Sequence, residues 1–566
     1  MTFRFSRQRL TDRDARLERC LEVLPGLTSW TILLGMLALS FWKPLTAAIL
    51  IIAFDLYWLL RLFYLTLFLV LSSVRLSLER STDWMARVHD LDDPVRTLGR
   101  LTAEPASGSW GRRLSRWIYR RQITRAVRAG APIPRPEQLR HLAIYTIANE
   151  PPEMLAEGLE SLARQTFPSR QILVVLAMEQ RAGPAVAAGL RELQRRFRGR
   201  FLELLLIEHP DGLPGEARVK GANATYAARA AAEWLTQRGI AFDDVIVSCF
   251  DADTVVSADY VSCLTYAFLV CPHRTRASFQ PIPVYHNNIW EVPAFARVLD
   301  MGSSFFQLIE ATNPEQLVTF SSHSMSFKAL VDVGYWPVDM VSDDSAIFWK
   351  AFLHFGGRYQ VVPMYVTVSL DVAAAGSWWQ AVRNVYKQKR RWAWGVENFP
   401  IVARGFLQAG DIPPSVRLRH AFKLFENHVS WATSAFLLSL IGWLPALFAG
   451  REFSSSVLYY SAPRATALIF QLASLALLTT IVLSLCLLPA TTSRHPFLKR
   501  IGHVVEWLLI PFFATFFSAL PALDAQTRLM FGRYMEFWVS DKRGTPAGLR
   551  QSLSAEKKLR MMEPSV

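Results

Sequence analysis

The chain has 566 residues, of which 51% are apolar and 12% are aromatic. This length exceeds the usual size of one domain and the composition is apolar for a purely soluble protein, so we expect several domains or a membrane part. The 62 Lys and Arg residues outnumber the 47 Asp and Glu residues, and the net charge of +15 favours an anionic partner such as a phosphate-bearing substrate, acidic lipid or nucleic acid. The five cysteines lack metal-ligand spacing, which argues against a zinc site and a disulfide framework.

Long apolar stretches lie near both ends of the chain. A helix that crosses a bilayer needs about 20 mostly apolar residues. Five stretches meet this requirement, at residues 24–42, 45–71, 429–449, 465–489 and 504–523. Pro511 and Pro521 interrupt the last stretch, so it is either one crossing or a re-entrant, split segment, and we expect five or six spans.

Arginines gather directly after the second apolar stretch, at Arg112, Arg113, Arg116, Arg120, Arg121, Arg125 and Arg128. Loops on the cytoplasmic side of a membrane carry an excess of Lys and Arg. We therefore expect a cytoplasmic soluble part in an integral protein of a bacterial inner or plasma membrane. The arginines also fit nucleic-acid binding, but they adjoin the membrane and have few aromatic neighbours for base stacking, so we expect no nucleic-acid partner.

The middle of the chain alternates between predicted strands and helices. Strands are predicted at residues 142–147, 171–178, 202–207 and 245–250, with helices after Pro151 and at residues 222–237. Strands separated by helices predict an α/β fold with a parallel sheet. Three of the strands are followed by polar residues, namely Asn149 and Glu150, Glu179, and Asp251 with Asp253. Because ligands bind beyond the carboxyl ends of parallel strands, we expect these residues to meet at one edge.

Short motifs follow one another in a fixed order: Ala148-Asn149-Glu150, Lys220-Gly221-Ala222-Asn223, Phe250-Asp251-Ala252-Asp253, Ser342-Asp343-Asp344 and Gln388-x-x-Arg391-Trp392. In this order they resemble the family 2 glycosyltransferases, and among them the processive membrane synthases typified by cellulose and hyaluronan synthases. The resemblance covers residues 142–400 and the flanking apolar stretches. It implies a GT-A fold, which is an α/β domain with a Rossmann-like mixed sheet, inserted between N-terminal and C-terminal transmembrane helices.

This resemblance divides the chain into successive parts. We expect an N-terminal tail with two transmembrane helices (1–74), a basic cytoplasmic linker (75–138), the GT-A glycosyltransferase domain (139–375), an amphipathic interface segment with the Gln-x-x-Arg-Trp motif (376–419), a C-terminal transmembrane region of three or four segments (420–540) and a basic cytoplasmic tail (541–566). In this arrangement a cytoplasmic nucleotide sugar reaches the catalytic domain, and the acceptor lies near the membrane.

Asp251 and Asp253 are the predicted metal ligands. A hard divalent cation, Mg²⁺ or Mn²⁺, held by one or two carboxylates neutralises a diphosphate as the sugar leaves. Residues i and i+2 of a strand lie on the same side, so both carboxylates can turn to one ion at the strand end. A surface turn is the alternative, because Asp-x-Asp pairs are common.

Asp344 is the predicted general base, which takes the proton of the acceptor hydroxyl as it attacks the anomeric carbon. The resemblance assigns this role to the second acid of the pair, with Asp343 orienting or screening it. The alternative is that both acids only stabilise the N-terminus of the following helix through its dipole.

Gln388, Arg391 and Trp392 lie close together on a predicted helix that begins near Ser377. Arg391 is predicted to pair with the leaving diphosphate, and Trp392 to stack on a sugar acceptor. The resemblance implies that this motif lies at the membrane surface near the acceptor. The alternative is an amphipathic interface helix, and both interpretations can hold together.

The predicted contacts of the nucleotide sugar are Asn149, Glu150, Glu179, Lys220, Asn223 and Asp251. The family usually shows two adjacent aspartates after its second strand, whereas this chain has Met178-Glu179-Gln180, so Glu179 is expected to contact the base in their place. Lys220 and Asn223 match the basic and amide pair of the family. The alternative for Lys220 is a solvated lysine at a helix start.

The sequence thus predicts an inverting, metal-dependent hexosyltransferase with a carbohydrate acceptor at the bilayer. Its donor is a nucleotide-diphosphate sugar, with a UDP-sugar favoured over a GDP-sugar. Its product is a β-linked polysaccharide that the enzyme extends, and whether the enzyme also exports this polymer stays open. Two alternatives stay open. One is single transfer to a lipid acceptor, in which the Gln-x-x-Arg-Trp motif is unusual, and the other is a non-catalytic polytopic membrane protein.

Overall fold

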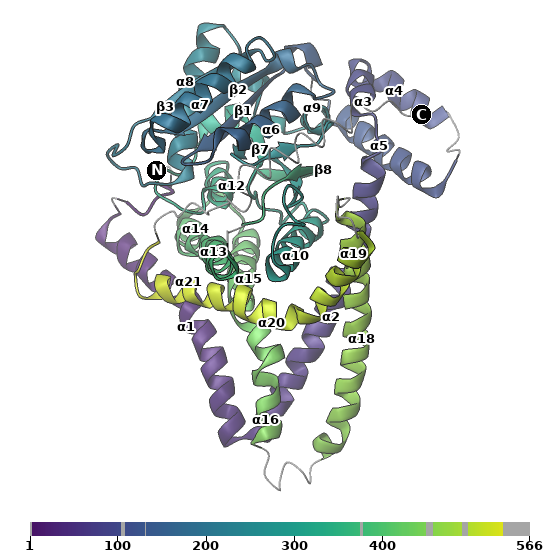
Figure 1. Ribbon diagram of the computed structural model, residues 1–566, viewed down its shortest axis with the longest axis vertical. Helices are drawn as coiled ribbons and strands as arrows, with labels where there is room; N and C mark the ends of the chain where they lie inside the picture. The colour runs from purple at the N-terminus through teal and green to yellow at the C-terminus, as the bar shows by residue number, and fades with distance from the viewer. Residues whose placement is uncertain are drawn as a thin grey trace.

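An α/β domain sits above a group of long apolar helices that extend away from it (Figure 1). The computed structural model describes residues 3–8, 10–103, 108–130, 132–373, 377–448, 457–489 and 496–535, and of residues 457–470 and 496 it describes the backbone alone. The basic tail predicted at residues 541–566 lies outside the described residues. Helices from before and after the α/β domain pack together beneath it, as α1 does with α15 and α21.

The α/β domain is built on an eight-stranded sheet with the order β3-β2-β1-β4-β7-β6-β8-β5. The strands are β1 (Arg140–Ile147), β2 (Ile172–Glu179), β3 (Glu203–His209), β4 (Val245–Asp251), β5 (Val255–Val256), β6 (Ala277–Val284), β7 (Ser324–Ser326) and β8 (Gln360–Ser369). Strands β1 to β4 run parallel, as expected from the sequence pattern, whereas the short β7 lies antiparallel between β4 and β6. The mixed sheet between two sets of apolar helices confirms the predicted fold class.

Helices cover both faces of the sheet and form the region beneath it. Before β1 lie α1 (Asp12–Trp42), α2 (Pro44–Glu79), α3 (Trp84–His89), α4 (Pro94–Ala103) and α5 (Trp110–Ala129). Within the domain lie α6 (Pro152–Ala163), α7 (Gly183–Arg196), α8 (Lys220–Gln237), α9 (Tyr260–Val270), α10 (Ala294–Glu310), α11 (Phe327–Asp332) and α12 (Asp343–His354). After β8 lie α13 (Trp378–Ala393), the 3-10 turn η7 (Trp394–Glu397), α14 (Asn398–Gln408), α15 (Pro414–Ser439), α16 (Leu444–Leu447), α18 (Val457–Leu487), α19 (Pro496–Glu506), α20 (Ile510–Ala514) and α21 (Leu520–Met530).

Successive side chains of β1 point to opposite faces of the sheet, and both faces are buried. Ala143 and Tyr145 pack with α6, α7 and α9 in one core cluster. Leu142 and Ile144 pack with α8, α11 and α12 in the other. Parallel strands that are covered on both sides are continuous apolar runs in the sequence, which is why the pattern of the chain reveals them.

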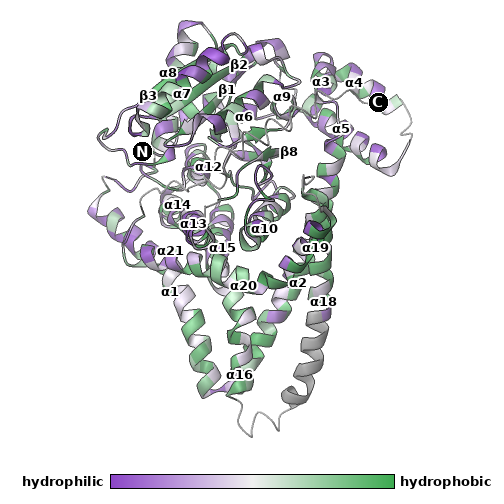
Figure 2. Ribbon diagram, viewed as in Figure 1, coloured by the Kyte–Doolittle hydropathy of each residue, from purple (hydrophilic) through white to green (hydrophobic). Residues whose placement is uncertain are grey.

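Three helical stretches in the described part of the chain are long and apolar enough to cross a membrane, namely α1, α2 and Phe497–Met530. The helix α15 passes the same test together with the short helices that follow it, as a pair bent by 44°, which raises the number to four. Figure 2 shows hydrophobic residues along the lower parts of α1, α2 and α16, where a bilayer would surround them.

The stretch from α19 to α21 runs across the other long helices instead of beside them (Figure 1). A 3-10 turn (Trp507–Leu509) and a π-helical turn (Thr515–Ala519) divide it into separate pieces. Pro511 and Pro521 each stand in the first turn of the piece that follows, where proline is tolerated because its missing N–H has no helical partner. The number of membrane crossings in this region stays a prediction.

Candidate functional site

Lys220 joins two of the sequence motifs at the edge of the sheet. Its Nζ lies 2.9 Å from Oδ1 of Asp251, at the end of β4, and 2.9 Å from Oδ1 of Asp344, in the first turn of α12. The Lys220 side chain is 8% exposed, whereas Asp251 is 29% exposed and Asp344 is 26% exposed. The two carboxylates therefore lie close together at a partly open site, and the buried ammonium group of Lys220 lies between them.

The close approach of α8 to the segment before α12 depends on Gly221. A Cβ atom at this position would lie 2.3 Å from the carbonyl oxygen of Pro337 and 2.9 Å from Cβ of Asp343. Because the nearest of these atoms belongs to the backbone, a larger residue would push the two elements apart. Glycine therefore allows the start of α8, and with it Lys220, to reach the acidic pair.

Burial and mutual charge determine the protonation of this cluster. Burial lowers the pKa of Lys220, but the carboxylates of Asp251 and Asp344 outweigh it and raise that pKa well above its usual value, so the ammonium keeps its charge. Burial and the charge of Asp344 raise the pKa of Asp343 well above its usual value, against the opposing effects of Lys220 and Arg391. Asp343 is 2% exposed. One acid of the pair is thus buried and favours its neutral form, while the other lies partly open.

Two residues that the sequence pattern does not single out also contact this cluster. The hydroxyl of Ser321 donates to Oδ2 of Asp251, and Nδ1 of His323 lies 3.8 Å from Oδ1 of Asp344. Between them, Ser322 has a φ of 61°, in the left-handed region. Burial lowers the pKa of His323 to about 4, so its ring is neutral at neutral pH. The short polar run at residues 321–324 is the sequence signal that points to them.

Asp253 lies behind the open part of the cluster. It is 1% exposed, and its Oδ2 accepts a hydrogen bond of 2.8 Å from the backbone N–H of Asp371. Nδ2 of Asn287 donates to the carbonyl of Asp253 at 2.9 Å and to Oδ1 of Asp371 at 3.0 Å. The segments that follow β6 and β8 thus close over the end of β4.

The oxygen atoms of this region fit a divalent cation in their chemistry. Asp251 and Asp253 offer carboxylate oxygens, which Mg²⁺ and Mn²⁺ prefer as ligands. Within the described residues no group of three or more His, Cys, Asp or Glu side chains is arranged to hold a metal. Phosphate oxygens and water would therefore complete the coordination. Asp251 is open enough for this, whereas a metal contact of the buried Asp253 stays a prediction.

Residues predicted to bind the nucleotide occupy the ends of β1 and β2. Oε2 of Glu150 accepts hydrogen bonds from the backbone N–H groups of Ala148 at 2.7 Å and Asn149 at 3.0 Å, which shapes the turn after β1. Glu179 is 8% exposed and pairs with Arg181. A cavity of about 110 Å³ lies beside this pair, between the ends of β2 and β3 and the segment that leads into α8.

Asn223 lies inside the domain. It is 1% exposed, and its Nδ2 donates to the carbonyl oxygens of Ala177 at 2.8 Å and Ile147 at 3.5 Å. These carbonyls belong to β1 and β2, so the amide ties the ends of two neighbouring strands together. The structure gives this asparagine a role in the fold, and contact with the donor stays a prediction.

The Gln-x-x-Arg-Trp motif occupies the last turns of α13, whose N-cap is Ser377. Gln388 is 3% exposed, and among the described residues none donates a hydrogen bond to its Oε1. The positive charge of Arg391 lowers the pKa of Asp343, although burial dominates there, so this arginine lies near the acidic pair. The motif and the predicted base therefore belong to one region of the molecule.

A buried ion pair covers one face of Trp392. Nζ of Lys389 lies 3.8 Å from the centroid of the Trp392 ring and 2.6 Å from Oδ1 of Asp300 on α10. The side chains of Lys389 and Asp300 are 3% and 2% exposed, and burial lowers the pKa of Lys389 while Asp300 raises it. The rings of Tyr285 and Phe320 lie 6.0 and 6.1 Å from the indole. The half-buried indole is thus held from several sides, which orients the part that stays open.

Part of the chain matches a known family and named relatives. Residues 246–493 match the model described as glycosyl transferase family group 2. The poly-beta-1,6-N-acetyl-D-glucosamine synthases of Staphylococcus aureus strains COL and N315 are each 28% identical to the chain over 164 residues, which is 26% of this chain. The aligned part spans 34% of the length of these relatives.

Two solved structures are distant likenesses. The mannosyltransferase PcManGT from Pyrobaculum calidifontis, in complex with GDP-Man and Mn²⁺, is 14% identical with a TM-score of 0.37 and covers 78% of this chain and 99% of its own. Residues 1–349 of S. aureus TarS in complex with UDP are 12% identical with a TM-score of 0.33 and cover 72% of this chain and 98% of their own. The family match includes Asp251 and Trp392, whereas Glu179 and Lys220 precede it.

Proposed function

We propose that this chain, which carries a family 2 glycosyltransferase domain, is an inverting enzyme that transfers a sugar from a nucleotide diphosphate to a carbohydrate acceptor at the membrane. The observation that carries the proposal is the contact of Lys220 with both Asp251 and Asp344. It joins the acid expected beside the diphosphate to the acid expected to act as base. With the donor diphosphate beside Asp251, an acceptor hydroxyl beside Asp344 would be near the sugar that is transferred.

The nucleotide is proposed to bind along the ends of β1 and β2. The cavity beside Glu179 supports a base at this position. The donor proposed for it is a UDP-sugar before a GDP-sugar. Lys220 then shares its positive charge between the carboxylates and the phosphates in charge-assisted hydrogen bonds. Mg²⁺ or Mn²⁺, held by Asp251 with Asp253, would neutralise the charge of the leaving diphosphate.

Asp344 is proposed to accept the proton of the acceptor hydroxyl. Its 26% exposure supports access from the acceptor side. Asp343 is buried, and burial raises its pKa, which favours the neutral form and opposes a second negative charge beside the base. Positioned proton transfer of this kind contributes about 10²- to 10⁴-fold to a rate.

The acceptor is proposed to approach along Trp392, whose open part offers an aromatic surface for a sugar ring. The name of the S. aureus relatives supports N-acetylglucosamine as the first sugar to test and polysaccharide extension as the type of product. The apolar helices beneath the domain support a reaction at the membrane. The domain is then cytoplasmic, and the growing polymer leaves through the helical region.

The experiment that tests the proposal uses the full chain in nanodiscs. We would incubate it with UDP- and GDP-sugars, including UDP-N-acetylglucosamine, plus Mg²⁺ or Mn²⁺, and measure released nucleotide and product size. Turnover that falls by about 10²- to 10⁴-fold in Asp344→Asn and persists in Asp332→Asn, a surface acid paired with Lys328 on α11, supports the proposal. No release of nucleotide from any donor would contradict it.

Product size separates the proposal from single transfer to a lipid. Repeated extension gives products that grow with time, whereas single transfer gives one product of fixed size that partitions with lipid. The packing around Trp392 favours extension, because a held aromatic ring suits an acceptor that is itself a sugar chain.

A further inference from the structure

A buried carboxylate holds the segment that carries the predicted base. Glu397, the last residue of η7, is 1% exposed. Its Oε1 accepts hydrogen bonds from the backbone N–H of Ser342 at 2.8 Å and from the Ser342 hydroxyl at 2.7 Å. Ser342 is the N-cap residue of α12, and Asp343 and Asp344 form the first turn of that helix. Glu397 therefore restrains the backbone at the point where the acidic pair begins.

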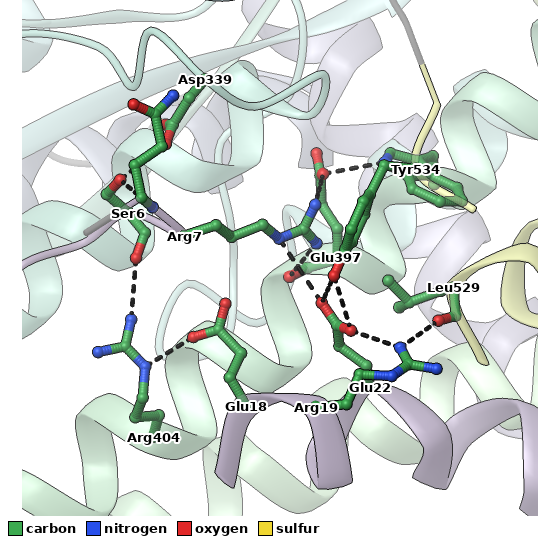
Figure 3. A network of polar contacts seen from close by, with 12 residues as sticks. Ser6, Arg7, Glu18, Arg19, Glu22, Asp339, Glu397, Arg404, Leu529 and Tyr534 are labelled. Atoms are coloured by element: carbon green, nitrogen blue, oxygen red, sulfur yellow. Dashed lines mark hydrogen bonds and ion pairs between the residues drawn. The ribbon is translucent and has the colours of Figure 1, made fainter. Parts of the chain in front are cut away.

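The other carboxylate oxygen of Glu397 pairs with the guanidinium of Arg7, in the N-terminal segment (Figure 3). Nη1 of Arg7 lies 3.0 Å from Oε2, and Nη2 of Arg7 donates to the Glu397 carbonyl at 3.4 Å. The indole N–H of Trp394 also donates to Oε2 at 2.9 Å. Both carboxylate oxygens are thus satisfied from fixed directions, and a buried carboxylate needs such partners.

The N-terminal segment also contacts the residues just before Ser342. The hydroxyl of Ser6 donates to Oδ2 of Asp339 at 2.7 Å, five residues before Asp344 in the sequence. Arg404 of α14 holds this segment by donating to the Ser6 carbonyl at 3.0 Å and to Oε2 of Glu18 at 2.6 Å. Residues 339–342 are thereby tied at one end directly to Ser6 and at the other end, through Glu397, to Arg7.

The end of α21 and the residues that follow it close the network from the other side. The guanidinium carbon of Arg7 lies 4.9 Å from the centroid of the Tyr534 ring. The Tyr534 hydroxyl donates to Glu22 at 2.9 Å, and Arg19 donates to Glu22 at 2.6 Å and to the carbonyl of Leu529 at 2.8 Å. Arg7 is therefore held between the end of α21 and Glu397, as Figure 3 shows.

Stability alone does not require this arrangement. Well-packed apolar residues stabilise a fold as well as a buried ion pair of similar volume does. What the ion pair adds is direction, because the two hydrogen bonds to Ser342 fix the orientation of the first turn of α12. The orientation matters at Asp344, whose Oδ1 must stay 2.9 Å from Nζ of Lys220 to complete the cluster.

We infer that Glu397, held by Arg7, is a positioning residue for the base Asp344, so that the N-terminal segment contributes to the transfer step without touching substrate. This inference rests on the proposed function of Asp344. A displacement of about 1 Å at a reacting group can cost about 100-fold in rate. We expect the effect in kcat, because neither Arg7 nor Glu397 lines the cavity proposed for the nucleotide base.

The test compares Arg7→Ala, Glu397→Gln and the double variant with Arg16→Ala in the full chain. Arg16 is exposed on α1, donates only to the carbonyl of Asp12 among the contacts described for it, and provides a matched loss of one positive charge. We expect kcat to fall by about 10- to 100-fold in Arg7→Ala and Glu397→Gln, with the donor KM within about 2-fold of the unmodified chain. The double variant should be no worse than the poorer single variant, and Arg7→Lys should recover most of the rate.

A second readout does not depend on turnover. Amide hydrogen exchange of a peptide that covers residues 338–346 should become faster in Arg7→Ala and Glu397→Gln, and should not change in Arg16→Ala. Unchanged kcat and unchanged exchange in both variants would overturn the inference even if the unmodified chain is active. The inference would also be overturned if the losses of kcat in the two single variants add in the double variant, while thermal stability falls and the donor KM rises by the same factor as kcat falls. If the unmodified chain transfers no sugar, the proposed function fails, and the exchange result still decides whether Glu397 orders this segment.

Discussion

The two sides of the candidate site are built differently. The sheet edge with Glu179, Lys220 and Asp251 is called the donor wall. The helical side with Asp300, Lys389, Trp392 and Glu397 is called the acceptor wall. On the donor wall the acid Asp251 is 29% exposed. On the acceptor wall the charges are enclosed, with Lys389 and Asp300 at 3% and 2% exposure. Lys220 and Glu179 are each 8% exposed, so Asp251 is the group of the donor wall that is open to a ligand. The acceptor wall offers no such open charge at Lys389 and Asp300.

On both walls, charges that are far apart in the sequence pair with each other, as Lys220 does with Asp344 and Lys389 with Asp300. On the donor wall, Lys220 at the start of α8 contacts Asp251 at the end of β4 and Asp344 at the start of α12, and each of these residues belongs to a sequence motif. The acceptor wall depends on Arg7 and Glu397, which are 390 residues apart. Variants that remove one charge should therefore change ligand binding on the donor side, whereas on the acceptor side they should change stability or the placement of Asp344.

The largest effect is expected at Asp344, where the two walls meet. Asp344→Asn keeps the size of the side chain but cannot accept a proton, so transfer should slow by about 10²- to 10⁴-fold. Donor binding, measured by calorimetry with Mg²⁺ or Mn²⁺, should persist. Equal turnover in this variant would reject the role of Asp344 as base.

A large loss of stability is expected on the acceptor wall when one partner of the buried pair is removed. Lys389→Met leaves the carboxylate of Asp300 buried without its cation, which should lower the free energy of unfolding by about 3–5 kcal/mol. The double variant Lys389→Met with Asp300→Leu should recover much of this loss, because neither charge is left unpaired. Denaturation in mild detergent measures the free energy of unfolding of both variants. A double variant as unstable as Lys389→Met would contradict the assignment of the loss to an unpaired buried charge.

A smaller effect, on affinity, is expected for Lys220 on the donor wall. Lys220→Gln removes the charge that we assign to the diphosphate, and a hydrogen bond to a charged group contributes about 1.5–3 kcal/mol, so donor affinity should fall by about 10- to 100-fold. Lys328→Gln is the control, because Lys328 pairs with the exposed Asp332 on α11 and does not line the cavity beside Glu179. An unchanged donor dissociation constant in Lys220→Gln would remove Lys220 from the donor site.

The smallest effect concerns pH and His323. Burial lowers the pKa of His323 to about 4 in the folded chain, against about 6.5 for an unfolded histidine. Between these values the unfolded state binds more protons, so stability falls as the pH drops from about 6.5 towards 4. His323→Asn should remove this contribution, of about 2 kcal/mol between pH 7 and pH 5. Thermal unfolding at the two pH values measures it, and an unchanged difference would contradict the assignment.

Much of the donor wall could be predicted from the sequence. The apolar runs of β1, β2 and β4 are continuous because both faces of the sheet are covered, and each run ends at a polar residue that the chain order alone assigns to one sheet edge. The position of Gln388, Arg391 and Trp392 on one helix also follows from local spacing. These features depend on residues within about ten positions of one another, which is the range of strand and helix periodicity.

Other parts of the site depend on contacts that no local pattern encodes. The short β7, which makes the sheet mixed, has no apolar run of its own length to mark it. Asn223, which matched a family motif, turns out to join β1 to β2. Ser321 and His323 reach Asp251 and Asp344 only because the segment before β7 folds back beside the end of β4.

The sequence by itself therefore determined the order of strands and helices, the apolar stretches and the set of acids from which the site is built. The tertiary structure alone decided that Lys220 lies between Asp251 and Asp344, and that Arg7 supports Ser342 through Glu397. The physical reason is that periodicity and turn chemistry act along the chain, whereas ion pairs depend on where the ends of distant elements meet.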